Sequence, residues 1–136
     1  MLNKEYKVVR PVENGAEGEK KLVHHVNDEN EKKDLFLVKI LPCSKTNDFE
    51  RYEREIRVMK ALDHKNIAKV VKAEREGGNL LVFFKYYEKG SLSDIFNDKS
   101  RLDEDECRRY FKQILEAVEY CHNNNIVHRD IKPDNM

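Results

Sequence analysis

The stretch that decides the fold lies near the C-terminal end of the chain: His128-Arg129-Asp130-Ile131-Lys132-Pro133-Asp134-Asn135. Taken singly, each residue has an ordinary interpretation, because most loop carboxylates and lysines in proteins are solvated surface groups. Their joint occurrence in one short window is rarely due to chance, however. The segment therefore indicates a functional loop.

The residues before this segment predict a long amphipathic helix. Asp103 and Glu106 have the spacing of an N-terminal cap, and residues 123–125, all asparagine, end the helix. Residues 91–94 predict the cap of a very short helix, and residues 126–127 predict one short strand pair. Apolar side chains recur at helical spacing, as Cys107, Tyr110, Phe111, Ile114, Leu115, Val118 and Cys121.

The first two thirds of the chain alternate short apolar runs with turn residues, a pattern typical of strands. Turn residues 76–79 separate the last two runs and predict a hairpin. The expected strands cover residues 6–12, 22–26, 34–41, 67–73 and 80–87.

One helix is expected between the third and fourth of these strands. Asn47 and Glu50 have capping-box spacing at its start. Its apolar stripe consists of Phe49, Tyr52, Ile56, Met59 and Leu62.

Residues 128–135 resemble, without a gap, the H-R-D-x-x-x-x-N catalytic loop of protein kinases. The resemblance implies an α+β fold in which residues 1–86 form the N-lobe, a small antiparallel sheet with one helix. Residues 87–136 then form the hinge and the beginning of the helical C-lobe. The stretch 120–135 is similar to the calmodulin-dependent and AMP-activated kinase groups.

The resemblance also implies roles for the loop residues in phosphoryl transfer, a reaction that depends on positioning and charge stabilisation. Asp130 accepts or orients the proton of the substrate hydroxyl, and Lys132 places positive charge on the phosphoryl oxygens. Asn135 offers an amide oxygen to Mg²⁺. The implied cofactors are ATP and Mg²⁺, and Lys132, two residues after Asp130, favours a serine or threonine of a protein substrate as acceptor.

Lys39 lies inside an apolar run and needs a counter-charge, because an unpaired ammonium group is costly in a low dielectric. Glu55 follows on the border of the helical stripe and resembles the glutamate that pairs with this lysine in kinases. For the pair alone, an equal alternative is that Lys39 extends to solvent from an edge strand beside an unrelated surface glutamate.

Residues 13–18 fall where kinases carry G-x-G-x-x-G, and only Gly15 and Gly18 are kept. Glycines there let backbone amides approach the phosphates, and Glu13 replaces the first of them. Lys20 replaces the branched residue that covers adenine, and Leu37 replaces the usual alanine. These departures predict weakened ATP binding.

Residues 80–87 resemble the strand that leads into the interlobe hinge of kinases. Phe84 takes the gatekeeper position, where an aromatic ring closes the pocket behind the nucleotide or simply fills core. The backbone groups of Lys85, Tyr86 and Tyr87 are expected to contact adenine.

Composition excludes several other classes of function. Lys plus Arg number 26 and Asp plus Glu also 26, so no basic field draws the chain to nucleic acid. The longest apolar runs are too short to span a membrane. The three scattered cysteines fit neither a zinc knuckle nor a disulfide framework, and we expect a cytoplasmic or nuclear protein.

The chain stops at Met136, before any D-F-G or A-P-E segment, so we expect these 136 residues alone to be inactive. The apolar face of the long helix, with Phe111 and Ile114, is then left for a partner to cover. Two alternatives stay open: a pseudokinase or kinase-derived binding module without catalysis, and an unrelated α+β interaction domain.

Overall fold

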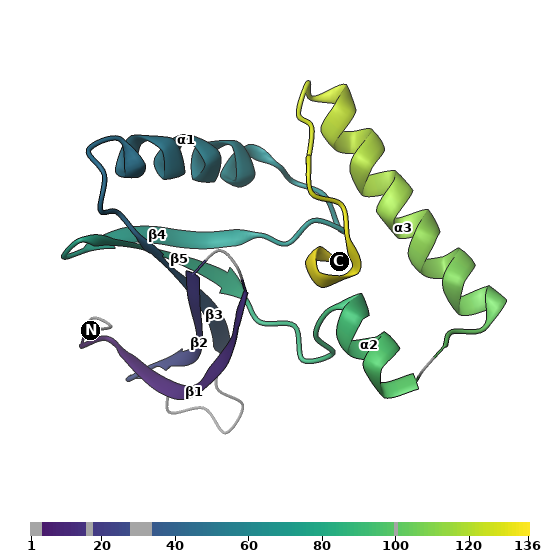
Figure 1. Ribbon diagram of the computed structural model, residues 1–136, viewed down its shortest axis with the longest axis horizontal. Helices are drawn as coiled ribbons and strands as arrows, with labels where there is room; N and C mark the ends of the chain where they lie inside the picture. The colour runs from purple at the N-terminus through teal and green to yellow at the C-terminus, as the bar shows by residue number, and fades with distance from the viewer. Residues whose placement is uncertain (1–3, 16–17, 28–33, 100) are drawn as a thin grey trace. The chain divides into compact units, whose positions relative to one another are not determined.

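The structure, a computed structural model, describes residues 4–15, 18–27, 34–99 and 101–136, with only the backbone of residues 13–15. Its contacts divide the chain into two units (Figure 1). The first comprises Met1–Ala61 and Ala68–Tyr86, and the second comprises Leu62–Ile67 and Tyr87–Met136. Each unit is considered by itself.

The first unit contains one five-stranded sheet with strand order β1-β2-β3-β5-β4 (Figure 1). Every neighbouring pair is antiparallel. The strands are β1 (Tyr6–Gly15), β2 (Gly18–His25), β3 (Leu35–Pro42), β4 (Val70–Glu76) and β5 (Asn79–Lys85). The predicted fold class, a small antiparallel sheet with one helix followed by helical structure, is confirmed.

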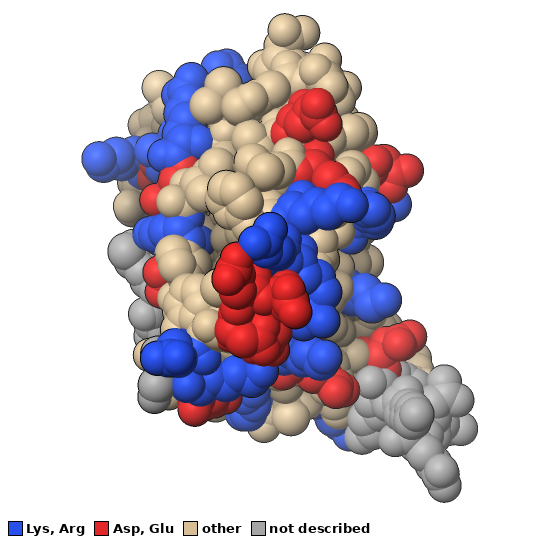
Figure 2. Space-filling model, turned by 90° about the vertical axis from the view of Figure 1, so that its right-hand side faces the viewer, with Lys and Arg blue, Asp and Glu red and all other residues tan. Residues whose placement is uncertain are grey.

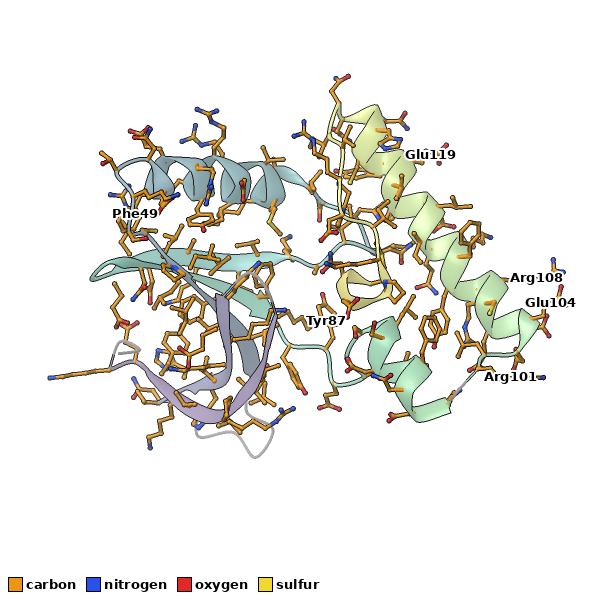
Figure 3. All side chains as sticks on the ribbon, viewed as in Figure 1. Phe49, Tyr87, Arg101, Glu104, Arg108 and Glu119 are labelled. Atoms are coloured by element: carbon orange, nitrogen blue, oxygen red, sulfur yellow. The ribbon has the colours of Figure 1, made fainter. Side chains whose placement is uncertain are left out.

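Helix α1 (Asp48–Ala61) covers one face of this sheet. Ile56 is buried against a cluster from β3, β4 and β5, and the predicted stripe residues Phe49, Tyr52 and Met59 pack around it. Figure 3 shows Phe49 at the start of the helix. Burial of a side chain such as Ile56 contributes about 1.5–3 kcal/mol, which fixes α1 on the sheet. The buried sheet residues of this cluster are Leu41, Val70, Leu80 and Val82.

The opposite face of the sheet has its own apolar cluster, formed by Val23, Val38, Leu81 and Phe83. Neighbouring strand residues alternate between the two clusters, as the pleat of a strand requires. Tyr6 at the start of β1 packs on the Phe83 ring with 4.8 Å between ring centroids. The beginning of β1 is thereby held against this face.

The second unit contains α2 (Leu92–Lys99), α3 (Glu104–Asn123) and the short 3₁₀ helix η1 (Pro133–Asn135). Asp103 caps α3, because its carboxylate accepts a hydrogen bond from the Glu106 backbone N–H at 2.8 Å. The predicted cap is confirmed. Glu104 and Arg108 pair one turn apart near the start of α3 (Figure 3).

Residues 62–67 belong to the second unit because their polar groups bond to α3. The Asp63 backbone N–H donates to the Tyr120 hydroxyl at 3.1 Å. Lys65 forms an ion pair with Glu116 at 3.0 Å, and the Asn66 amide donates to the same carboxylate at 3.2 Å. These bonds explain why the fourth strand begins at Val70, three residues later than predicted.

The predicted strand pair at residues 126–127 is wrong, since neither residue is in a strand. The Ile126 N–H instead donates to the Cys121 carbonyl at 2.9 Å, which closes the end of α3. Asn125 takes a positive φ of 59° in the same turn. The backbone there completes the helix terminus and is not available for a strand ladder.

Helix α3 keeps large apolar side chains in solvent: Phe111 is 61% and Leu115 52% exposed. Between α2 and α3 lies an apolar hollow of about 420 Å³, lined in part by Phe96 and Phe111. Figure 2 shows basic and acidic side chains interspersed on the face it presents. Among the described helices, none is long and apolar enough to cross a membrane.

Candidate functional site

The segment from Asp130 to Asn135 folds back on itself through its own side chains. The 3₁₀ turn η1, which Pro133 begins, returns Asn135 to Asp130. The Asn135 amide donates to the Asp130 carbonyl oxygen and to its Oδ2, each at 2.9 Å. The sequence predicted a joint role for these two residues, and the structure brings them together.

Lys132 joins the same cluster, with its Nζ 3.2 Å from Asp130 Oδ2. The hydrogen bond from Lys132, followed by the one from Asn135, holds the pKa of Asp130 below its usual range. Both side chains of the ion pair are about half exposed, at 49% and 51%. The Asp130 carboxylate is therefore ionised at neutral pH and open to an incoming group.

The backbone around Asp130 is in an unusual conformation. Arg129 has a φ of 69°, in the left-handed region that non-glycine residues seldom occupy. The Asp130 N–H donates to the His128 Nδ1 at 3.2 Å, which ties the strained peptide to the preceding side chain. Strain of this kind is common at functional sites and is consistent with a loop built to present a carboxylate.

Asn135 fits the predicted role of a Mg²⁺ ligand. Because its Nδ2 donates to Asp130, its Oδ1 faces the other way, as a neutral hard oxygen. Within the described part of the chain, no group of three or more His, Cys, Asp or Glu could hold a metal ion.

Lys39 lies in β3 on the sheet face that α1 covers. It is the direct partner of Val82, which belongs to the apolar cluster under α1. Directly opposite residues of an antiparallel pair share a face of the sheet. Glu55 lies in α1 next to the buried Ile56, and it is exposed to solvent. The pairing of Lys39 with Glu55 stays a prediction.

Gly15 and Gly18 are partners where β1 ends and β2 begins, and residues 16–17 between them lie outside the described part. Gly18 has a φ of 121°, and a Cβ there would lie 2.5 Å from the Ile40 carbonyl oxygen. Only glycine fits this position, because of its close approach to β3. An approach of this turn to phosphate stays a prediction.

The predicted hinge residues lie where β5 ends. Lys85 is the last residue of β5, and the next N–H, of Tyr86, donates to the Leu35 carbonyl at 3.2 Å. Tyr87, labelled in Figure 3, is the first residue of the 87–136 segment of the second unit. It has 52% of its surface exposed. The Tyr86 N–H is engaged by β3, and the Tyr87 carbonyl accepts a hydrogen bond from the Gly90 N–H at 3.2 Å. Contacts of the Lys85 and Tyr87 backbone with adenine stay a prediction.

The sequence did not predict that Lys20 and Lys39 lie next to each other. It indicated only that Lys20 replaces the residue that covers adenine in kinases. Lys20 and Lys39 are direct partners on β2 and β3. The signal that could have found this relationship is the register of the two strands. It was hidden by the polar connection between them, whose length does not determine the pairing.

Comparison with known proteins agrees with this geometry. Residues 6–136 match the family described as protein kinase domain. The chain is 34% identical over 131 residues to the carbon catabolite-derepressing protein kinase of Candida tropicalis, covering 96% of the chain and 21% of that protein. It is also 34% identical over 134 residues to the SNF1-related protein kinase catalytic subunit alpha KIN12 of Arabidopsis thaliana, covering 96% and 26%.

A third relative, CBL-interacting protein kinase 33 of Oryza sativa subsp. japonica, is 38% identical over 87 residues, covering 64% of the chain and 19% of that protein. The chain thus spans only 19% to 26% of the length of these three relatives.

Proposed function

Because this chain belongs to the protein kinase family, we propose that it supplies the nucleotide-binding and catalytic-loop segments of an ATP-dependent serine/threonine protein kinase. The observation that carries the proposal is the Asp130 carboxylate, held by Lys132 and Asn135 through the same oxygen. An unrelated α+β interaction domain is excluded by the family match, which covers residues 6–136.

The loop residues suit transfer of a phosphoryl group to a hydroxyl. The ionised, half-exposed Asp130 has its Oδ1 available to accept the proton of a serine or threonine hydroxyl. Lys132, beside it, stabilises negative charge that develops on the transferred group. The Asn135 amide oxygen holds Mg²⁺, which when bound neutralises charge on the phosphates.

Nucleotide binding is assigned to groups of the first unit. Lys39 and Glu55 provide the charge pair that orients the phosphates, and the backbone at Gly15 and Gly18 approaches them. By resemblance to the family, backbone groups of Lys85 and Tyr87 are assigned to adenine. The acceptor is a protein whose serine or threonine is phosphorylated.

The competing proposal is a pseudokinase or kinase-derived binding module. It is favoured by Glu13 in place of the first glycine. It is also favoured by Gly18, whose conformation is required by the Ile40 carbonyl whether or not phosphate binds. Both proposals predict the same fold, and they differ in whether MgATP binds.

Nucleotide binding is tested by thermal unfolding of this chain with and without MgATP. A nucleotide at about 100 times its Kd stabilises a folded binder by about 2.7 kcal/mol. We expect a clear rise in Tm for the wild type, lost in Lys39→Met and kept in Lys21→Met. Lys21 is the matched control because it pairs with Val38 and faces the opposite side of the sheet. No shift at millimolar MgATP would favour the binding module.

Catalysis is tested in the protein that contains this chain, by measuring phosphate transfer to a protein or peptide substrate. Asp130→Asn is expected to lower kcat by a factor of about 10²–10⁴, the usual contribution of a general base, with MgATP binding unchanged. A variant with the wild-type rate would remove Asp130 from the reaction.

A further inference from the structure

A row of four directly paired residues crosses the sheet of the first unit on the face that α1 covers. Val12 pairs with Lys20, Lys20 with Lys39, and Lys39 with Val82. Directly opposite residues have Cβ atoms about 4.5–5.5 Å apart. The chain therefore places two ammonium side chains side by side on one half-buried surface.

Like charges at such positions oppose folding unless each has a partner of opposite charge. Within the described residues, no carboxylate forms an ion pair or hydrogen bond with Lys20. Its neighbour Glu19 points to the other face of the sheet, where it pairs with Lys21 at 3.1 Å. The described part of the chain thus leaves the charge of Lys20 to a ligand or to solvent.

The surroundings of Lys20 define the ligand further. Val12 is its direct partner on β1, and Leu37 is a diagonal neighbour on β3 on the same face of the sheet. A lysine stem covers apolar surface while its amine extends to a polar group. The position therefore combines an apolar surface suited to a base with a second positive charge beside Lys39.

We propose that Lys20 is a second cationic contact for the phosphate chain of a bound nucleoside triphosphate, with its stem covering the base. This inference rests on the nucleotide-binding function proposed above. In this inference Lys20 binds the nucleotide directly. The sequence alone indicated only that the branched residue covering adenine had been replaced.

The experiment titrates this chain by calorimetry at low ionic strength with three probes: ATP, adenosine and inorganic tripolyphosphate. Lys20→Gln is expected to weaken binding of both ATP and tripolyphosphate about tenfold, a loss typical of one charge-assisted contact. Adenosine affinity should stay within about twofold, because Gln keeps part of the stem. Lys20→Arg should retain triphosphate binding, and Lys21→Gln, facing the other side, serves as the matched control.

Salt dependence provides a readout that a purely structural residue would not change. The wild-type affinity for ATP should fall with salt more steeply than that of Lys20→Gln, because one fewer charge is screened in the variant. Thermal unfolding without ligand verifies that Lys20→Gln and Lys20→Val are folded.

Two results overturn the inference. One is that Lys20→Gln binds ATP as tightly as the wild type does, and also binds tripolyphosphate as tightly. The other is that Lys20→Val binds ATP more tightly than the wild type, which would mean that the Lys20 side chain obstructs the adenine site. The proposed function fails separately, if the wild type binds neither ATP nor adenosine. In that case tripolyphosphate binding that requires Lys20 would still uphold the paired-lysine anion site, and no binding of any probe would end both.

Discussion

Asn135 and Asp130 are joined twice, since the amide Nδ2 of Asn135 lies 2.9 Å from both the carbonyl oxygen and Oδ2 of Asp130. These two hydrogen bonds close the turn that η1 makes, and they fix the Asp130 carboxylate relative to the backbone. Lys132 binds the same Oδ2, so the other oxygen is left for chemistry. The orientation of the candidate base is thus encoded within six consecutive residues, 130–135.

The first prediction concerns the charge of Asp130. Lys132, and then Asn135, lowers its pKa below the ordinary value of 3.8. Lys132→Met should raise this pKa toward the ordinary value, and Asn135→Ala should raise it less. Titration of the carboxyl carbon by NMR measures both. A native pKa at or above 3.8 would contradict the cluster.

The lowered pKa also fixes the pH dependence of stability. A carboxyl whose pKa is depressed in the folded state stabilises the fold above its unfolded pKa, and this contribution disappears as pH falls through the folded pKa. The gap in unfolding free energy between wild type and Lys132→Met should therefore be larger at pH 7 than at pH 2. A gap that does not shrink in acid would mean that Lys132 acts by packing.

The second prediction concerns Gly18. Gly18 has a φ of 121°, and the Cβ of an alanine at this position would lie 2.5 Å from the Ile40 carbonyl oxygen. Gly18→Ala is therefore strained. We expect a loss of about 1–3 kcal/mol in the free energy of unfolding, measured by urea denaturation. Gly78→Ala is the matched control, because nothing lies within 4 Å of its Cβ and its φ is not positive. Equal stability of the two variants would show that small shifts of the backbone relieve the close contact between position 18 and β3.

Much of the fold could be predicted from the sequence because periodicity reports burial locally. The apolar stripe of Phe49, Tyr52, Ile56 and Met59 predicted the packing face of α1, and all four pack into one cluster. The cap at Asp103 was equally local, since it needs only the N–H three residues later. For the same reason the sequence predicted the cluster of Asp130, Lys132 and Asn135, which lie within one turn of chain.

What the sequence could not reveal depends on contacts distant along the chain. The register that sets Lys20 opposite Lys39 follows from strand pairing across a polar connection. The attachment of residues 62–67 to α3 depends on bonds such as Asp63 to Tyr120, 57 residues apart. The apolar pair at 126–127 was wrongly predicted as strand, because two β-branched residues favour a strand but do not reveal whether a partner strand exists.

The third prediction concerns that attachment. Tyr120→Phe removes the hydroxyl that accepts the Asp63 N–H at 3.1 Å. The free energy of unfolding should fall by about 0.5–1.5 kcal/mol, the net value of one hydrogen bond. Tyr110→Phe is the control on the same helix, since no hydrogen bond of its hydroxyl occurs among the described residues. Hydrogen exchange at the Asp63 amide should accelerate in Tyr120→Phe and not in Tyr110→Phe. Unchanged exchange in Tyr120→Phe would show that the Asp63–Tyr120 hydrogen bond does not protect this amide.

The fourth prediction concerns the exposed apolar side chains of α3. Phe111 and Leu115 lie one helical turn apart, with 61% and 52% of their surfaces exposed. Adjacent large apolar side chains in water favour association with another apolar surface. Phe111→Ser combined with Leu115→Ser should therefore reduce concentration-dependent self-association of this chain in sedimentation velocity. Because both side chains are already exposed in the folded state, its unfolding free energy should change by less than about 1 kcal/mol.

The matched control for this face is Lys112→Ser, which alters an exposed polar position between the two apolar residues. It should leave association unchanged, because the apolar surface of Phe111 and Leu115 remains. If the double variant associates as strongly as the wild type, association must arise from another surface. A loss of stability well beyond 1 kcal/mol would instead mean that these side chains pack within the folded chain, in contrast to their exposure in the structure.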